Sequence, residues 1–281
     1  MIIKFGARGD AVVSIQKQLI SLGFKAKDGK ALKPDGDFGA NTEYAVLQFQ
    51  KSVGILADGK VGDKTRAALA GQNVSKFLKD SDYTAAAKRL KVSELAIRVF
   101  GATEGRGVGF LNNGKAKILL ERHRMYFYLV QLKGKTFANA QMKQYPNLVN
   151  TATGGYKGDT AEYTRLSLAK NISPEAALMS CSWGQFQIMG ENWKDLGYSS
   201  VFDFETQMQT SESLQLEAFI RFIEWKTGTV NGKKVALIDA LRAENWEAVF
   251  TLYNGPNYKK LGYQAKFQKE WDHLEPIYGE K

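Results

Sequence analysis

Two copies of one short pattern restrict what the first 70 residues can fold into. The run from Asp35 to Thr42, DGDFGANT, is echoed from Asp58 to Thr65 as DGKVGDKT. In each copy an Asp-Gly pair forms a turn, and the threonine lies near the start of an apolar helical run. An earlier apolar face predicts another helix between Asp10 and Gly23. The repeat therefore predicts three short helices joined by Gly-Asp turns.

This segment resembles the three-helix peptidoglycan-binding domain found on many cell-wall hydrolases. The recurring marks of that family, G-x-R-G-x-x-V, D-G-x-F-G and D-G-x-x-G-x-x-T, occur here from Gly6, Asp35 and Asp58 onward. Their glycines and aspartates act directly as turn formers, so binding is implied by the resemblance alone. The weakly implied wall contacts are Asp37, Phe38, Asn41 and Asp58. We assign residues 1–72 to this domain and place the boundary within 71–80.

A second stretch, from Ser93 to His123, places carboxylates by local structure. Apolar residues at helical spacing, with Ser93 as N-cap, predict a helix that ends near Thr103, before two glycines. Glu104 therefore lies at a helix C-terminus, where the helix dipole disfavours negative charge. This position favours the protonated acid.

The residues after Glu104 predict a hairpin about Asn113-Gly114, with alternating apolar residues on either side. Pairing about that turn would put Glu121 opposite Gly105 or Arg106. The two carboxyl groups would then lie roughly 5 to 10 Å apart, the separation that glycoside hydrolysis uses for an acid and a second carboxylate.

Both carboxylates also have simpler interpretations. Glu121 lies in Glu-Arg-His and could pair with Arg122 or Arg124 on a solvated edge. Glu104 could be an ordinary surface residue at a helix end. The helix, the hairpin and their meeting point together favour the catalytic interpretation over either alternative.

Three runs then carry a resemblance to the N-acetylmuramidase domain of phage endolysins, a helical lysozyme-like family. They are TEGRGVGFLNNGKAKILLERH, EAALMSCSWGQFQIMGENW and LYNGPNY, within residues 80–281. The family patterns are E-x-x-G-x-G-F, I-L-F-E-R-H, A-S-W-G-x-x-Q-I-M-G and Y-N-G-P. This chain departs from them at Leu120 and Cys181 and in RMYFYLV after the Arg-His pair, but no carboxylate is lost. The resemblance implies a mainly α fold, with a small three-helix domain and a larger helical domain bearing a short β-hairpin.

The resemblance also implies an activity and a set of site residues. The activity is cleavage of the β-1,4 bond from N-acetylmuramic acid to N-acetylglucosamine, with Glu104 as general acid and Glu121 as second carboxylate. The implied substrate contacts are Tyr126, Ser182, Trp183, Gln187, Tyr253 and Asn254, and Ile188 is implied on the cleft side with Trp183 and Gln187. Trp183 could equally be a core aromatic.

Local patterns predict the remaining elements of the larger domain. Residues 134–158 are polar and Gly-rich and predict a long irregular loop. A helix is expected next, over residues 160–170. Ser173-Pro174 marks the start of another helix, expected to continue to about Gln187. A long amphipathic helix is expected after Glu212, and a turn over 253–258.

Composition narrows the chemistry and the partners. One cysteine and two histidines indicate neither a disulfide framework nor a zinc site, and no metal or other cofactor is expected. A thiol peptidase built on Cys181 and His123 lacks an identifiable third group. The net charge of +10 suggests an acidic partner. Nucleic acid, an anionic membrane surface and the peptidoglycan and lipopolysaccharide of an envelope all fit this charge, but without a basic run of five or more a dedicated nucleic-acid arm is not indicated. The resemblance to wall hydrolases implies bacterial peptidoglycan as the partner.

The same sequence sets expectations about location. No run of 18 apolar residues predicts membrane insertion, and the first residues lack a signal-peptide pattern. We expect a monomer that stays in the host cytoplasm until it is released to the cell wall. Two rival functions remain: a lytic transglycosylase, which uses a single acid/base, and a non-catalytic wall-binding virion protein.

Overall fold

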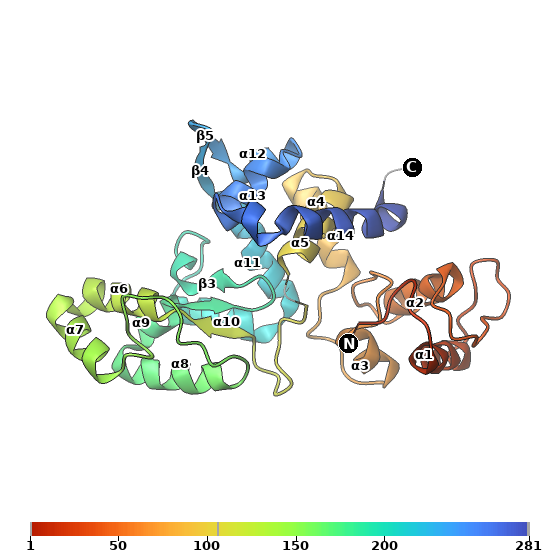
Figure 1. The fold of residues 1–281 in the computed structure, drawn as a ribbon, viewed down its shortest axis with the longest axis horizontal. Helices are drawn as coiled ribbons and strands as arrows, with labels where there is room; N and C mark the ends of the chain where they lie inside the picture. Colours follow the sequence, from red (N-terminus) through yellow and green to blue (C-terminus); the bar gives the residue numbers. More distant parts are fainter. Residues whose placement is uncertain (1, 106, 280–281) are drawn as a thin grey trace. The chain divides into compact units, whose positions relative to one another are not determined.

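The computed structural model describes residues 2–105 and 107–279, which fold mainly as helices (Figure 1). The chain forms two compact units, Met1–Ala85 and Ala86–Lys281. The mainly α prediction is confirmed. Within the described residues no helix is long and apolar enough to cross a bilayer.

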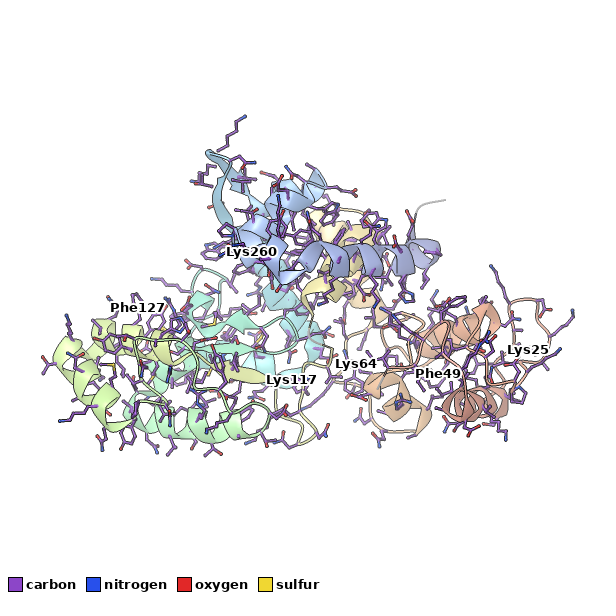
Figure 2. The ribbon with its side chains drawn as sticks, viewed as in Figure 1. Lys25, Phe49, Lys64, Lys117, Phe127 and Lys260 are labelled. Carbon is purple, nitrogen blue, oxygen red and sulfur yellow. The ribbon has the colours of Figure 1, made fainter. Side chains whose placement is uncertain are left out.

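The N-terminal unit contains the three predicted helices, α1 (Asp10–Ser21), α2 (Ala40–Ser52) and α3 (Asp63–Leu69). An apolar cluster forms the core of the three helices, and Phe49 of α2 lies within it (Figure 2). The buried members are Ile3, Val12, Ile15, Leu19, Leu32, Phe38, Ala45, Val46, Phe49 and Val61.

The first copy of the repeat is built around a buried glutamine from the preceding helix. The Gln16 amide donates to Asp35 Oδ1 at 2.8 Å and to Thr42 Oγ1 at 3.0 Å. It also donates to the Asp37 carbonyl at 3.0 Å, while Gln16 Oε1 accepts from the Gly36 N–H at 2.9 Å. One side chain therefore closes the whole Asp-Gly turn.

The second copy repeats this network with Gln50 of α2. Its amide donates to Asp58 Oδ1 at 2.9 Å and to Thr65 Oγ1 at 3.1 Å. It also donates to the Lys60 carbonyl, and its Oε1 accepts from the Gly59 N–H, both at 2.9 Å. The repeat is thus a unit of glutamine, turn and threonine, in which the glutamine was not evident from sequence.

Replacing Gln50 with methionine tests how strongly this hydrogen-bond network stabilises the turn. The variant leaves buried turn groups without their partner, which costs about 1–3 kcal/mol. The amide of Gly59 should then exchange its hydrogen faster, as measured by hydrogen–deuterium exchange. Gln18→Met, on the exposed face of α1, is the matched control. Equal exchange at Gly59 in both variants would contradict the assignment.

The C-terminal unit has a three-stranded antiparallel sheet and a separate hairpin. Helix α4 (Asp80–Leu90) spans the junction between the units. The sheet has the order β1–β2–β3 and the hairpin pairs β4 with β5. The strands are β1 (Ile118–Leu120), β2 (Cys181–Trp183), β3 (Ile188–Met189), β4 (Thr227–Val230) and β5 (Lys233–Ala236).

Helices pack around the three-stranded sheet, whereas the β4–β5 hairpin projects from α12 and α13 at the edge of the unit. The last helix, α14, lies against α5 (Figure 1). The α-helices of this unit are α5 (Glu94–Glu104), α6 (Arg122–Lys133), α7 (Lys135–Gln144), α8 (Ala161–Ile172), α9 (Pro174–Met179), α10 (Val201–Thr210), α11 (Glu212–Trp225), α12 (Leu237–Arg242), α13 (Trp246–Asn254) and α14 (Tyr263–Tyr278). Two 3-10 turns complete it, η1 (Gly190–Asn192) and η2 (Tyr258–Leu261).

Two predicted helix starts are confirmed by their caps. Ser93 accepts a hydrogen bond from the Ala96 N–H, and Ser173 accepts one from the Ala176 N–H with Pro174 in the first turn. Each serine thereby satisfies an N–H group that the helix itself leaves unpaired.

The predicted pairing of the hairpin is wrong beyond its tip. Phe110 bridges Ala116, but the strand after Lys117 turns away and pairs with β2. The Gly109 N–H donates to Glu212 at 2.6 Å, so it is not available to extend the ladder. Glu121 is therefore held opposite Ser180, whose carbonyl accepts its N–H at 2.9 Å, and not opposite Gly105. The alternative position, Arg106, lies outside the described residues.

The helix expected to reach Gln187 is also wrong, because α9 ends at Met179. Cys181–Trp183 is a buried strand that bridges β1 and β3. Gly184 then turns with a φ of 71°. The local helical pattern is overridden by pairing that buries both faces of the strand.

The loop predicted over 134–158 is partly wrong, because Lys135–Gln144 forms α7 and packs against α6. Gly134, with a φ of 88°, separates the two helices. Pro146 disfavours helical backbone at Tyr145, which explains why α7 ends at Gln144. The polar composition of α7 concealed a helix that buries only Ala138.

Candidate active site

Glu104 is the last residue of α5, and its side chain is brought into a pocket by that helix end. The residue is 8% exposed, and its Oε1 accepts a hydrogen bond of 2.8 Å from Asn254 Nδ2. Lys266 of α14 donates to the neighbouring Thr103 carbonyl. The end of α5 and the Asn254 amide together fix the position of the Glu104 carboxyl group.

The pocket around Glu104 has a volume of about 250 Å³ and draws on distant parts of the chain. Glu104 is the carboxylate among its lining residues, which otherwise are aromatic, apolar or amide-bearing. They are Glu104, Phe186, Gln187, Ile188, Met189, Asn192, Phe222, Tyr253, Asn254 and Tyr263. Such a mixture of apolar walls and a few polar groups is typical of a small-molecule or sugar site.

Packed rings fix the aromatic part of this wall. Phe186 stacks on Phe219 with centroids 4.5 Å apart, and Phe222 meets Tyr253 edge to face at 5.5 Å. Phe100 of α5 packs against both Phe219 and Tyr253. The helix that ends in Glu104 is thereby coupled to the rings that form the pocket.

Gln187 lines the pocket in a turn that its own side chain stabilises. Its φ is 52°, its Oε1 accepts from Ser182 Oγ at 2.9 Å, and its Nε2 donates to the Gly184 carbonyl at 2.9 Å. Ser182 is buried, and its hydroxyl holds the Gln187 side chain in place. Of these two predicted contacts, Gln187 is the one placed at the pocket wall.

Glu121 lies outside the lining of this pocket, directly before α6. Its Oε2 accepts a hydrogen bond of 2.7 Å from the Tyr156 hydroxyl, and His123 Nδ1 lies 3.4 Å away without hydrogen-bond geometry. Burial and this bond to Glu121 raise the pKa of Tyr156. The simpler interpretation placed Arg122 or Arg124 beside Glu121.

Those two arginines have other partners. Arg122 donates to backbone carbonyls of the loop at Ala152 and Thr153. Arg124 forms an ion pair of 2.6 Å with Glu191, which also accepts from the Tyr128 hydroxyl. Glu191 precedes pocket residue Asn192, so this cluster supports one wall of the site.

A buried ion pair of α8 fixes the strand end that carries Glu121. Glu162 is fully buried, and its Oε2 lies 2.6 Å from Arg165 Nη1 and accepts from the Leu120 N–H. Arg165 donates in turn to the Leu120 carbonyl at 3.0 Å. Burial alone would raise the pKa of Glu162, but the N–H groups of Lys157 and Leu120 and the Arg165 guanidinium lower it.

Two other predicted sugar contacts lie away from the pocket lining. Trp183 is fully buried and its indole N–H donates to the Leu178 carbonyl, as a core aromatic would. Tyr126 donates to Asn139 and links α6 to α7. Tyr253 and Asn254 line the pocket as expected.

The pocket residues that sequence reasoning missed are Phe186, Met189, Asn192, Phe222 and Tyr263. The first three fall inside the run EAALMSCSWGQFQIMGENW, so the motif was the available signal. Phe222 lies in the long amphipathic helix expected after Glu212, and its local sequence gave no sign of a place at the pocket.

The described parts of the chain contain neither a reactive thiol nor a cluster of metal-ligating side chains. Cys181 is fully buried, and this burial raises the pKa of its thiol far above neutral pH, which opposes a nucleophilic role. No group of three or more metal-ligating side chains is found within residues 2–105 and 107–279.

The wall-contact candidates of the N-terminal unit differ in exposure. Phe38 is fully buried in the core, and Asp58 Oδ1 is occupied by the Gln50 network. The Asp37 side chain is 49% exposed and lies 3.5 Å from Arg8. Asn41 is exposed and accepts from the Lys27 N–H.

Comparison with known proteins agrees with this arrangement. Residues 93–275 match the N-acetylmuramidase family, and residues 8–69 match a putative peptidoglycan binding domain. The crystal structure of the Burkholderia AP3 phage endolysin superposes with a TM-score of 0.87 at 40% identity, covering 99% of this chain and 100% of that one.

Shorter matches connect the chain to other wall enzymes. A probable N-acetylmuramoyl-L-alanine amidase of Bacillus licheniformis is 36% identical over 84 residues, 30% of this chain and 23% of that protein. A spore cortex-lytic enzyme of Halalkalibacterium halodurans is 41% identical over 68 residues, 24% of this chain and 19% of that protein. The chain thus spans only about a fifth of these curated relatives. By its longer matches, the chain belongs to the N-acetylmuramidase family of peptidoglycan hydrolases and joins that domain to an N-terminal domain of the peptidoglycan-binding type.

Proposed function

We propose that this protein is an endolysin-type N-acetylmuramidase that hydrolyses the β-1,4 bond from N-acetylmuramic acid to N-acetylglucosamine. The observation that carries the proposal is Glu104, a buried carboxyl group in the wall of an aromatic pocket, hydrogen-bonded to Asn254. The N-terminal unit would hold the enzyme, as a monomer, on the peptidoglycan of the bacterial host. Release from the host cytoplasm to the wall is part of the same proposal.

In this mechanism Glu104 protonates the glycosidic oxygen as the bond to the muramic carbon breaks. An oxocarbenium-like transition state then forms on the sugar ring. Asn254 orients the carboxyl group through its amide hydrogen bond. Tyr253 and Gln187 supply an apolar face and an amide for the bound sugar.

Glu121 is proposed as the second carboxylate, either holding the attacking water or stabilising the developing positive charge. The Tyr156 hydroxyl and the strand pairing at Ser180 fix its position. Both possibilities require an ionised Glu121 near the sugar in the complex.

The test of bond specificity is borohydride reduction of the products released from purified peptidoglycan. A muramidase leaves new reducing ends on muramic acid, so the reduced sugar recovered after acid hydrolysis should be muramicitol. Recovery of glucosaminitol would assign the other glycosidic bond, and new free amino groups without new reducing ends would assign an amidase.

Replacing Glu121 with glutamine tests the second carboxylate. The variant keeps the size of the side chain but removes its charge, and we expect kcat to fall by about 10²-fold or more. Tyr156→Phe removes only the hydroxyl donor and should cost less. Initial rates on soluble peptidoglycan fragments measure both. An unchanged rate in the Glu121 variant would assign that residue to structure alone.

A lytic transglycosylase is the second candidate function, because Glu104 is the carboxylate within the described pocket lining. Such an enzyme uses one acid/base and forms an anhydro sugar without water. If Glu121→Gln kept full activity, this candidate would be preferred.

A further inference from the structure

An exposed tryptophan continues the aromatic wall of the pocket outward. Phe222 lines the pocket, and Trp225 follows it by one turn at the end of α11, with ring centroids 5.7 Å apart. Trp225 is 39% exposed, whereas the rings deeper in the cluster, Phe186 and Phe219, are buried. Part of the Trp225 ring is therefore open to solvent, next to a ring that lines the pocket.

The backbone around Trp225 is held firmly. The Leu237 N–H donates to the Lys226 carbonyl at 2.8 Å and closes the base of the β4–β5 hairpin. Gly228 lies so close to Leu252 that a Cβ there would come within 2.7 Å of its methyl carbon. These contacts anchor the hairpin on α13 (Figure 1).

The hairpin that follows Trp225 carries positive charge at its base and at its tip. Lys226 Nζ lies 5.7 Å from the Trp225 ring centroid and 5.8 Å from that of Phe222. Lys233 and Lys234 are exposed on the hairpin, and no acidic residue occurs from Lys226 to Ile238. Of the two flanking acids, Glu224 is bound to Arg89 at 2.6 Å and Asp239 lies 3.5 Å from Arg242.

We propose that Trp225, Lys226 and the β4–β5 lysines form a substrate subsite adjoining the Glu104 pocket. Trp225 would receive the apolar face of a further sugar ring of the glycan strand. The lysines would bind the carboxylates of its stem peptide, since the N-acetylglucosamine units carry no charge. This inference rests on the proposed function and adds the recognition of peptide-bearing glycan.

The inference is tested on two soluble substrates, a glycan oligomer with stem peptides and the same oligomer after carbodiimide amidation of the peptide carboxylates. Trp225→Ala should lower kcat/KM about tenfold on both, as expected for a buried aromatic contact in a complex. Lys226→Gln/Lys233→Gln/Lys234→Gln should lower it about tenfold on the unmodified oligomer only, with a weaker salt dependence. Phe202→Ala, a similarly exposed aromatic on α10, is the control.

Two outcomes overturn the subsite. One is a Trp225 variant that matches Phe202→Ala on both substrates, and the other is a triple lysine variant that loses activity equally on both. If the native protein cleaves neither oligomer, the proposed function fails instead. In that case the subsite is tested by binding. Calorimetry measures the affinity of both oligomers for the Glu104→Gln protein, with and without the Trp225 and lysine substitutions. The same two outcomes, now in affinity, would overturn the subsite.

Discussion

Replacing Glu104 with glutamine is expected to lower kcat for peptidoglycan cleavage by about 10³-fold, because general acid catalysis by a positioned side chain typically contributes 10²- to 10⁴-fold. Glutamine has the same shape and still offers an oxygen to Asn254, whose amide now donates at 2.8 Å. The pocket should therefore remain intact. Initial rates of fragment release from purified peptidoglycan measure the loss.

Two controls separate chemistry from folding and binding in this variant. Glu175→Gln changes an exposed glutamate in the first turn of α9 and should keep native activity. The Glu104 variant should also co-sediment with insoluble peptidoglycan as the native protein does, because the N-terminal unit is untouched. Retention of more than a tenth of native kcat would remove Glu104 from the mechanism.

Replacing Arg165 with methionine is expected to destabilise the C-terminal unit by about 3–5 kcal/mol, since it leaves the buried Glu162 carboxylate without its cation. The variant also removes the donors to the Leu120 and Asn147 carbonyls. The protein's five tryptophans all lie in the C-terminal unit, so their fluorescence in a denaturant titration follows that unit alone.

The matched control is Lys170→Met on the same helix. It breaks the ion pair with Glu205, whose partners are 33% and 21% exposed, and should cost at most about 1 kcal/mol. A loss in the Arg165 variant no larger than in this control would contradict the role of the buried pair.

Acid should reduce the difference between the native protein and the Arg165 variant. The pKa of Glu162 in the folded protein is below its usual 4.5. Its ionised form therefore contributes stability that is present above pH 4.5 and is lost as the pH falls through the lower folded pKa. Denaturant titrations at pH 7 and below pH 4 measure this change.

The sequence was sufficient for those parts of the fold that local chemistry determines. Ser93 and Ser173 cap the helices they were predicted to start, and Glu104 lies at the helix end where the glycines placed it. The Asp-Gly repeat likewise predicted the turns of the N-terminal unit. Each of these features depends on residues that are close together in the chain.

Features that depend on distant pairing could not be derived in this way. Cys181–Trp183 follows a helical pattern but is a strand, because β1 and β3 flank it on both sides. Gln16 closes a turn 20 residues away in sequence, and its letter alone gives no sign of this. Glu121 was expected opposite Gly105, but the buried pair Glu162–Arg165 holds its strand against Ser180.

The same distinction applies to the site. Glu104, Tyr253 and Asn254 lie in short motifs, and all three line the pocket. Phe222 lies in an ordinary amphipathic helix, and its place at the pocket follows only from how α11 packs against α13 and its Tyr253. Motifs thus identified the polar groups of the pocket, whereas the position of Phe222 in its wall depends on tertiary packing and could not be predicted from the sequence.

The central claim, that Glu104 acts in hydrolysis of the muramic glycosidic bond, is tested most directly by digesting purified peptidoglycan in ¹⁸O-labelled water and weighing the products by mass spectrometry. We predict fragments that end in reducing muramic acid with one ¹⁸O atom, formed by the native protein and not by Glu104→Gln. Unlabelled anhydro ends, or ¹⁸O in the carboxyl groups of released stem peptides, would contradict the account.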